Sequence, residues 1–224
     1  MKKLLILFCL IIKFGPINGQ TDSTNSQSKK TKKLHLGPLF KSEDTLKFTV
    51  FANLKPLLKD RGENTKNHWG SVRYTDSNDS LFDIPIKVKV RGNFRRMVEN
   101  CSFPPLLLDF DKKKKEKSVF KQQNKLKLVT HCLKNDYIMQ EYLVYKIYNL
   151  ITETSFKARI AHVTYQDSAN KRASETRLAF LIEDDDDLAK RLLAKSYKKV
   201  RIRQNQADSL QMATVSVFEY LIGN

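Results

Sequence analysis

The sequence predicts an α+β fold, with several strands followed by one buried helix, a strand pair, an acidic turn and two more helices. Three observations support this class. Short segments of alternating apolar and polar residues fill the first half of the chain. Residues 136–151 are apolar at helical spacing. Strands and helices do not alternate regularly, as they would in a parallel doubly wound sheet.

The strands are expected first, because their alternation is clear. Lys87 and Lys89, for example, alternate with Ile86, Val88 and Val90, so one face is apolar and the other basic. Polar turn sequences separate the strands. Five strands are predicted before the long helix, at residues 46–54, 71–75, 84–90, 105–110 and 125–129.

The helical segments come later in the chain. Apolar residues surround most of the circumference of 136–151, so this helix is expected to be buried on more than one side. Residues 159–165 and 176–182 are predicted to form a hairpin around a polar loop. A short helix at 188–195 and a longer one at 207–222 complete the prediction.

The beginning of the chain is typical of an export signal. Lys2 and Lys3 precede nine apolar residues, too few to span a bilayer, and small residues follow at 18–20. We therefore expect a signal peptide at 1–19, a disordered polar and basic linker at 20–40, a main domain at 41–183 and a helical segment at 184–224. The protein is expected to be exported, to the periplasm, the cell surface or the medium, without a transmembrane span.

The charge is strongly basic. The formal net charge is +17, and removing Lys2, Lys3 and Lys13 with the signal leaves +14. Such a field favours acidic partners, although a lysine-rich solvated surface would give the same composition. No nucleic-acid-binding motif is present, which argues against nucleic acid as the partner. Cys101 and Cys132 remain after the signal, either as a disulfide or as two separate thiols.

One constellation points to chemistry by its spacing. Lys125 and Lys127 share a face of their strand, and Glu141 on the helix follows them by 16 and 14 residues. A helix packed on the sheet could place Glu141 beside either lysine, as in protein kinases, where such a pair orients ATP phosphates. The alternative is an exposed lysine face and a partly solvated glutamate.

Other motifs are weaker. Arg91-Gly92-Asn93 follows a strand, where glycine lets the backbone turn or approach a phosphate, but a single glycine also fits a plain turn. The acidic run 184–187 lacks EF-hand spacing and suits the start of a helix. No zinc, Walker or nucleophile-elbow motif occurs, so no metal ligand or catalytic residue is assigned.

Several segments taken together resemble the CotH-like family of secreted or spore-coat proteins, which have an atypical protein-kinase-like fold. The resemblance covers 84–187, nearly half of the chain. It departs from the family where Phe94-Arg95-Arg96 replaces the usual Ser or Thr after Arg-Gly-Asn. The matching segments are Arg91-Gly92-Asn93 with its strand, the Pro-Pro-Leu strand at 104–110, the Lys125 strand, the helix from Asp136, and the strand ending in Ile182-Glu183-Asp184.

The resemblance implies a kinase-like N-lobe, an antiparallel sheet with one buried helix, followed by a hinge and the first helices of a C-lobe. It implies ATP and Mg²⁺ as cofactors and a hydroxyl-bearing or acidic protein as substrate. Lys125 or Lys127 would contact phosphates, Glu141 would orient that lysine and Glu183 would lie at the adenine hinge. Arg91, Gly92 and Asn93 would form part of the phosphate-facing turn.

The family's catalytic and metal-binding aspartates follow the helix that 207–222 corresponds to. We therefore expect this chain alone to show no phosphoryl transfer, either as the N-terminal part of a kinase-like enzyme or as a non-catalytic relative. The other interpretation is an exported, non-enzymatic basic domain that binds an acidic partner through surface charge.

Overall fold

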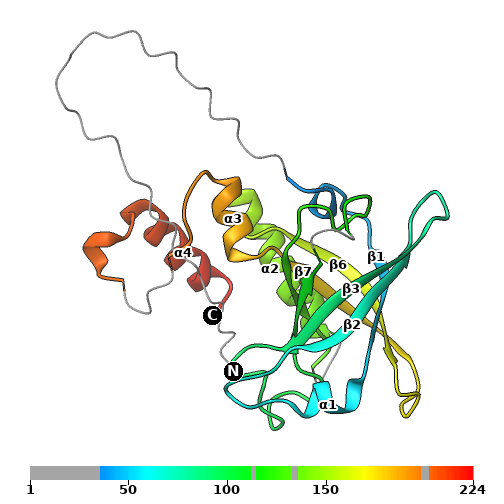
Figure 1. The fold of residues 1–224 in the computed structure, drawn as a ribbon. Coiled ribbons are helices and arrows are strands. Elements are labelled where there is room, and N and C mark those ends of the chain that lie inside the picture. Colours follow the sequence, from blue (N-terminus) through cyan, green and yellow to red (C-terminus); the bar gives the residue numbers. More distant parts are fainter. Residues whose placement is uncertain (1–35, 112–114, 133–135, 198–201, 224) are drawn as a thin grey trace. The chain divides into compact units, whose positions relative to one another are not determined.

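Seven strands form one closed barrel in the computed structural model, within the described residues 36–111, 115–132, 136–197 and 202–223 (Figure 1). The order around the barrel is β1-β2-β3-β4-β5-β7-β6. The five strands predicted before the long helix and the two predicted after it are all present. They are β1 (Leu46–Ala52), β2 (His68–Thr75), β3 (Leu81–Val90), β4 (Leu106–Phe110), β5 (Lys125–Val129), β6 (Ala158–Asp167) and β7 (Glu175–Ile182).

Parallel pairing between β1 and β6 closes the barrel. Leu46 pairs with Ala161 at one end of the contact and Ala52 with Asp167 at the other, while all other neighbouring strands are antiparallel. The expected open antiparallel sheet of a kinase-like N-lobe is therefore wrong. Pairing the first strand with one more than 100 residues later satisfies the backbone groups of both edges, which an open sheet would leave exposed.

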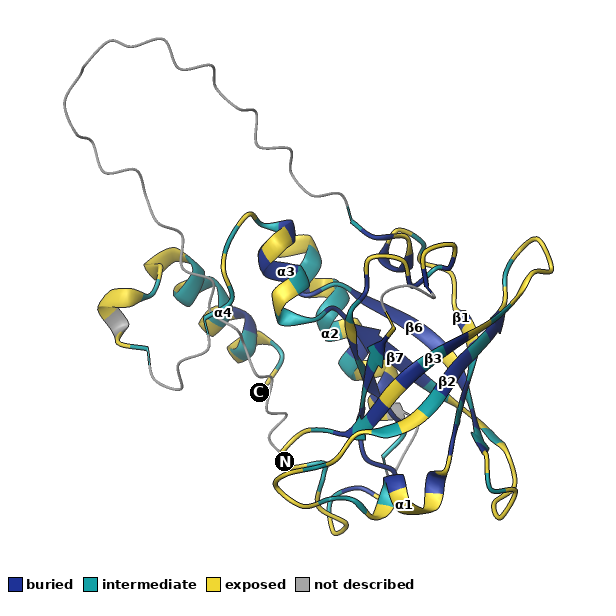
Figure 2. Ribbon diagram, in the orientation of Figure 1, coloured by how far each residue is buried: buried dark blue, intermediate teal, exposed yellow. Residues whose placement is uncertain are grey.

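The barrel interior is a packed core. Inward-facing residues from all seven strands are buried. Figure 2 shows buried residues in dark blue along the labelled strands. Phe120, from the loop between β4 and β5, lies at the centre of an aromatic cluster. Its ring centroid is 4.9 Å from that of Phe110, 5.6 Å from that of Tyr74 and 6.0 Å from that of Phe48. These rings fill the space in which some barrels hold a ligand.

Helix α2 (Asp136–Ile151) packs against the outer face of β6 and β7. Tyr142 and Tyr145 contact Phe180 of β7, with ring centroids 6.0 and 5.7 Å apart, so the second half of this strand is buried on both faces. The helix has the predicted bounds, but burial on more than one side is not observed. Its other side is exposed at Met139, Leu143, Ile147, Leu150 and Ile151.

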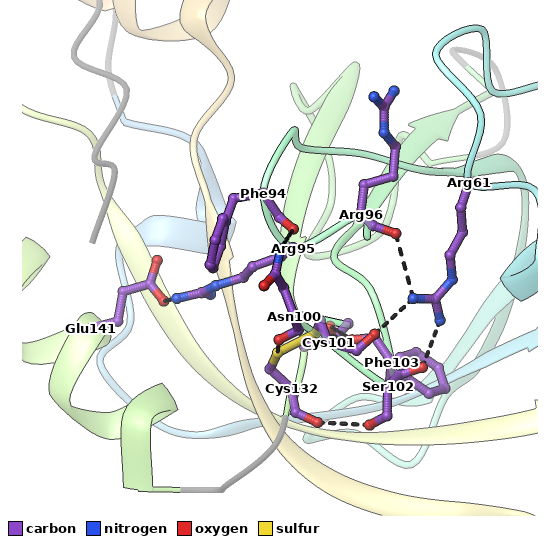
Figure 3. The surroundings of a disulfide bond; sticks show 11 residues. Arg61, Phe94, Arg95, Arg96, Asn100, Cys101, Ser102, Phe103, Cys132 and Glu141 are labelled. Atoms are coloured by element: carbon purple, nitrogen blue, oxygen red, sulfur yellow. Dashed lines mark hydrogen bonds and ion pairs between the residues drawn. A yellow bond between two sulfur atoms is a disulfide. The ribbon is translucent and has the colours of Figure 1, made fainter. Parts of the chain in front are cut away.

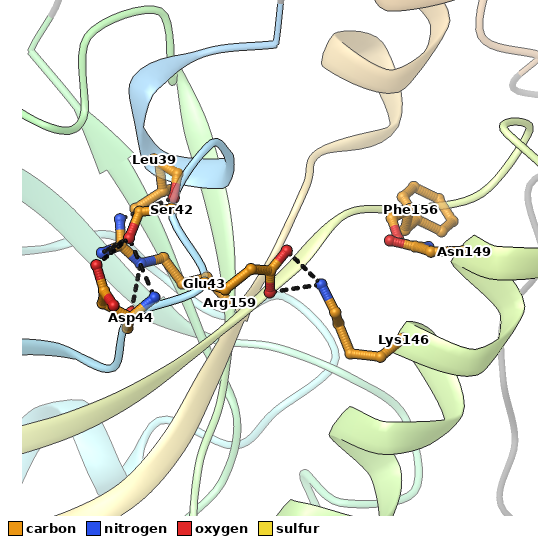
Figure 4. A network of polar contacts seen from close by, with 8 residues as sticks. All are labelled: Leu39, Ser42, Glu43, Asp44, Lys146, Asn149, Phe156 and Arg159. Carbon is orange, nitrogen blue, oxygen red and sulfur yellow. Dashed lines mark hydrogen bonds and ion pairs between the residues drawn. The ribbon is translucent and has the colours of Figure 1, made fainter.

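The segment before β1 joins the barrel instead of continuing the expected linker to residue 40. Leu39 and Phe40, in the 3₁₀ turn η1 (Pro38–Phe40), are buried. The Arg159 guanidinium donates to the carbonyls of Leu39 at 2.9 Å and Asp44 at 3.0 Å, and Lys146 of α2 pairs with Glu43 at 2.6 Å (Figure 4). The signal peptide and the rest of the linker lie outside the described residues.

Two short features were not predicted from the sequence. Helix α1 (Leu54–Lys59) begins where the Asp167 carboxylate accepts the Leu54 N–H at 2.9 Å, so a residue 113 positions away satisfies one of its free donors. Lys115, the last of four consecutive lysines at 112–115, is buried and donates to the carbonyl of Gln123 and, at 3.1 Å, to Asn124. Residues 112–114 lie outside the described residues.

Residues 36–184 make one compact unit, and the described residues after Asp184 belong to another. The second contains α3 (Asp185–Arg191), the 3₁₀ turn η2 (Gln204–Gln206) and α4 (Ser209–Leu221). Helix α3 begins three residues earlier than predicted, because Asp185, Asp186 and Asp187 occupy its first turn, where negative charge is favoured. Asp208 caps α4 by accepting the Gln211 N–H at 2.9 Å. In the described part of the chain, no helix combines the length and apolarity needed to cross a membrane.

Candidate anion-binding face

The two candidate lysines lie on the outside of the barrel. Lys125 and Lys127 alternate along β5 with Leu126 and Leu128, which are fully buried in the core. Strand β5 pairs with β4 at both lysines and with β7 at Lys127, so Lys127 projects from the middle of a sheet. A closed sheet holds such side chains at fixed spacing.

Register brings two further lysines onto the same face. Lys87 of β3 lies opposite Asp109 of β4, which lies opposite Lys125. In the neighbouring row, Lys89 lies opposite Leu107, which lies opposite Lys127. Adjacent strands are about 4.8 Å apart, so each row places its two lysines roughly 10 Å from each other. We call Lys87, Lys89, Lys125 and Lys127 the cationic face.

Within the two rows, lysines outnumber acidic residues. Asp109 is the one acidic side chain in these two rows, against four lysines. Lys87 and Lys125 are exposed, while Lys89 and Lys127 are half-buried. Like charges this close repel one another across water, and a bound anion would relieve that repulsion.

Glu141 has a partner other than a strand lysine. Its Oε2 lies 2.7 Å from Nη2 of Arg95, in the loop after β3, and its side chain is 12% exposed (Figure 3). Burial raises the pKa of Glu141, while the positive charges of Arg95 and Arg91 act to lower it. Lys127 instead places its ammonium 4.6 Å from the centroid of the Phe156 ring. The partner observed for Glu141 is thus Arg95, and its expected role in orienting a lysine toward ATP remains a prediction.

The Arg91-Gly92-Asn93 turn leaves β3 as expected. Gly92 has φ of +90°, a left-handed conformation that glycine adopts without strain. The Arg91 N–H donates to the carbonyl of Pro105 at 2.9 Å, which fixes the start of the turn. Beyond it, Arg61 donates to the carbonyls of Cys101 at 2.7 Å and Ser102 at 2.6 Å, and the Cys101–Cys132 disulfide joins the loop to the end of β5 (Figure 3).

Glu183 is buried at the end of β7. Its carboxylate accepts the Lys157 N–H at 3.1 Å, and its own N–H donates to the Lys157 carbonyl at 2.9 Å. This exchange closes the β6–β7 pair next to Ala158 and Ile182. Glu183 therefore has a structural role, and its contact with adenine remains a prediction.

A Mg²⁺ ion in this protein would be held by oxygen-donating side chains. Among the described residues, no group of three or more His, Cys, Asp or Glu side chains is arranged to hold a metal ion. The roles of Arg91, Gly92, Asn93, Lys125, Lys127, Glu141 and Glu183 in binding ATP remain predictions.

Sequence comparison and structural comparison add no relative. No protein-family model, no curated protein and no solved structure matches this chain. The resemblance to the CotH-like family therefore stays a prediction, and function has to be argued from the side chains themselves.

Two members of the cationic face were not singled out from the sequence. Lys87 and Lys89 were recognised as the polar side of a strand, but their alignment with Lys125 and Lys127 depends on the register of β3, β4 and β5. The alternation of lysine with apolar residues in both strands indicates that these lysines face outward. The sequence does not indicate which strands are neighbours in the sheet.

Proposed function

We propose that this protein is a non-enzymatic binding domain whose cationic face takes an acidic polymer. One observation carries the proposal: the register of β3, β4 and β5 gathers four lysines on one outer face with a single aspartate between them. A polymer with repeated negative charges could contact several of these lysines at once, whereas a single small anion could not.

The outer surface is favoured over the interior as the binding site. Aromatic rings around Phe120 pack the barrel, so a ligand has no room inside without displacing them. The lysines also project from strands paired on both sides, which limits the conformational entropy lost when a partner binds. The net charge of +17 adds long-range attraction toward the same class of partner.

The test compares two variants of equal charge. In the first, the four lysines of the cationic face become glutamine. In the second, the control, four exposed lysines elsewhere, Lys41, Lys47, Lys55 and Lys59, become glutamine. Exposed ion pairs contribute roughly 0.2–1 kcal/mol each. Losing four should therefore cost about 0.8–4 kcal/mol and weaken binding of polyphosphate about fourfold or more, since 1.4 kcal/mol is tenfold.

The control should change this affinity by less than about twofold at 0.15 M salt, where charges more than about 8 Å from the polymer are screened. Equal weakening by both variants would mean that only net charge matters, and the cationic face would not be a site. The control should keep the unfolding temperature of the parent, because its lysines are exposed. The cationic-face variant should unfold at a slightly lower temperature, because Lys127 loses its contact with the Phe156 ring.

The nucleotide interpretation is tested by the same proteins. A ligand at 100 times its dissociation constant stabilises the folded state by about 2.7 kcal/mol. We expect ATP with Mg²⁺ to give no such stabilisation at millimolar concentration. A saturable rise in unfolding temperature that requires Lys127 would favour nucleotide binding instead.

A further inference from the structure

A groove of about 490 Å³ lies on the outer wall of the barrel, over β1, β2 and β3. It adjoins the cationic face, because Trp69 of β2 lies directly opposite Lys87 of β3. The residues that matter to its chemistry are Phe51, Trp69, Ser71, Arg73, Asp83 and Pro85.

Strand register explains how these side chains meet. Ser71 lies opposite Phe51 on β1 and opposite Pro85 on β3, so its neighbours stand on both sides. Trp69 and Arg73 are two residues away on the same strand and share its outer face. Ser71 therefore forms the floor of the groove, and the larger side chains form its walls.

Trp69 gives the groove an exposed apolar platform. It is the one tryptophan of the chain, and the residue is 74% exposed. An indole ring left in water at the rim of a concave site offers a large, rigid surface on which a flat apolar face can stack. The Lys87 ammonium lies 5.2 Å from the centroid of this ring, which places a positive charge beside the platform.

Polar groups that can form further hydrogen bonds lie next to the Trp69 ring. Ser71 is only 8% exposed, and its Oγ has no hydrogen-bond partner among the residues that the structure describes. Arg73 donates from Nε to Asp83 at 2.9 Å, and its guanidinium stacks 3.9 Å from the centroid of the Phe51 ring. Stacking and pairing fix the orientation of the guanidinium, whose five N–H donors exceed the one bond to Asp83.

These groups together suit a sugar ring. A pyranose has an apolar C–H face for the indole, and its hydroxyls both donate and accept hydrogen bonds. Asp83 accepts, Arg73 donates and the Ser71 hydroxyl does both. Leaving a buried hydroxyl without a hydrogen bond costs free energy. A ligand that forms a hydrogen bond with the Ser71 hydroxyl would remove this cost and bind more tightly.

We infer that the groove binds a pyranose ring of an acidic polysaccharide, whose carboxylates then lie along the row from Lys87 to Lys125. This inference rests on the proposed function, since the cationic face would supply the remaining contacts. It adds the chemical class of the polymer: a polyanion built of sugar rings, held by stacking as well as by charge.

The experiment uses Trp69 as its own reporter. The full chain is titrated with an octamer of galacturonic acid, with the neutral galactose octamer and with an oligothymidylate of eight nucleotides. Intrinsic fluorescence follows Trp69, and calorimetry gives the dissociation constants. The acidic octamer should shift the tryptophan emission saturably and bind at least tenfold more tightly than either of the other two.

Variants separate the groove from the charge. Trp69→Ala and Ser71→Val should each weaken the acidic octamer about tenfold while leaving the affinity for polyphosphate within twofold. Tyr137→Ala is the matched control, because it removes another aromatic ring exposed in this structure, on α2. It should change neither affinity. The unfolding temperature of Trp69→Ala should equal that of the parent, which excludes a folding defect.

The possible failures are distinct. If the cationic-face variant weakens the octamer but Trp69→Ala does not, the groove inference is overturned and the proposed function stands. If oligothymidylate binds more tightly than the octamer in a Trp69-dependent way, the sugar class is wrong. If the neutral octamer binds through Trp69 and no polyanion binds at all, the acidic class and the proposed function both fail.

Discussion

Arg95 and Glu141 form a short ion pair, with Nη2 and Oε2 2.7 Å apart, between the loop after β3 and helix α2. Both side chains are largely buried, at 22% and 12% exposure. The pair gives Glu141 the counter-ion that its burial demands. It also takes the place of the lysine–glutamate pair that the sequence spacing suggested.

Replacing Arg95 with Gln should leave a buried carboxylate without its counter-ion. We expect the free energy of unfolding to fall by about 1–3 kcal/mol, the usual cost of leaving a buried polar group unsatisfied. Urea denaturation measures this loss. Adding Glu141→Gln should restore part of it, because the charge that needed a partner is then gone. Strictly additive effects of the two substitutions would contradict the coupling.

His131 should make stability depend on pH. Burial lowers its pKa from the ordinary value of 6.5, an effect opposed by Glu175 and reinforced by Arg177 and Arg172. The folded state therefore favours the neutral imidazole, whereas the unfolded chain takes up a proton near pH 6.5. The free energy of unfolding is highest above pH 6.5 and falls as the pH drops through the lowered pKa.

The measurement is urea denaturation of the parent and of His131→Gln at pH 7.5 and pH 5.5. The parent should lose stability between the two, and the variant should lose less, because it has no imidazole to protonate. An identical loss in both proteins would show that other groups set the dependence. The Nδ1 atom of His131 has no hydrogen-bond partner within the described ranges, consistent with a neutral ring.

The Cys101–Cys132 disulfide should contribute measurably to stability. It joins residues 31 positions apart and links the loop after β3 to the end of β5. Closing a loop of this length restricts the unfolded chain, so replacing both cysteines with serine should cost about 2–4 kcal/mol. Reduction of the disulfide in the parent should lower the unfolding temperature by as much as the double substitution does. An unchanged unfolding temperature after complete reduction would contradict this.

The elements could be predicted from the sequence because each is encoded locally. Alternation at Ile84, Ile86, Val88 and Val90 identifies β3, and the 3.6-residue period identifies α2 with its observed bounds. Alternation also assigns the inner and outer faces of each strand. Strand ends are less well predicted: β2 begins at His68 and β3 at Leu81, each three residues before the predicted start. The predicted β2 strand therefore leaves out Trp69, which is central to the groove.

Closure of the barrel could not be predicted in the same way. The contact between β1 and β6 joins Leu46 to Ala161 across 115 residues. The residues of neither strand indicate which other strand it pairs with. A strand with one apolar face suits an open sheet as well as a barrel. The cationic face could not be predicted for the same reason, because its two rows of lysines form only when β3, β4 and β5 are neighbours in this order. Likewise, Glu141 was sought beside a lysine of the sheet, whereas its partner lies in a loop.

The salt dependence of binding tests the central claim most directly. Each lysine contact to a polyanion releases about one counter-ion, so the slope of log K against log salt counts the contacts made. For polyphosphate between 50 and 300 mM salt, replacing Lys87, Lys89, Lys125 and Lys127 with Gln should reduce this slope by roughly three to four. The control with Lys41, Lys47, Lys55 and Lys59 replaced should keep the parent slope. An equal reduction in both variants, or an unchanged slope in the first, would contradict a binding site on the cationic face.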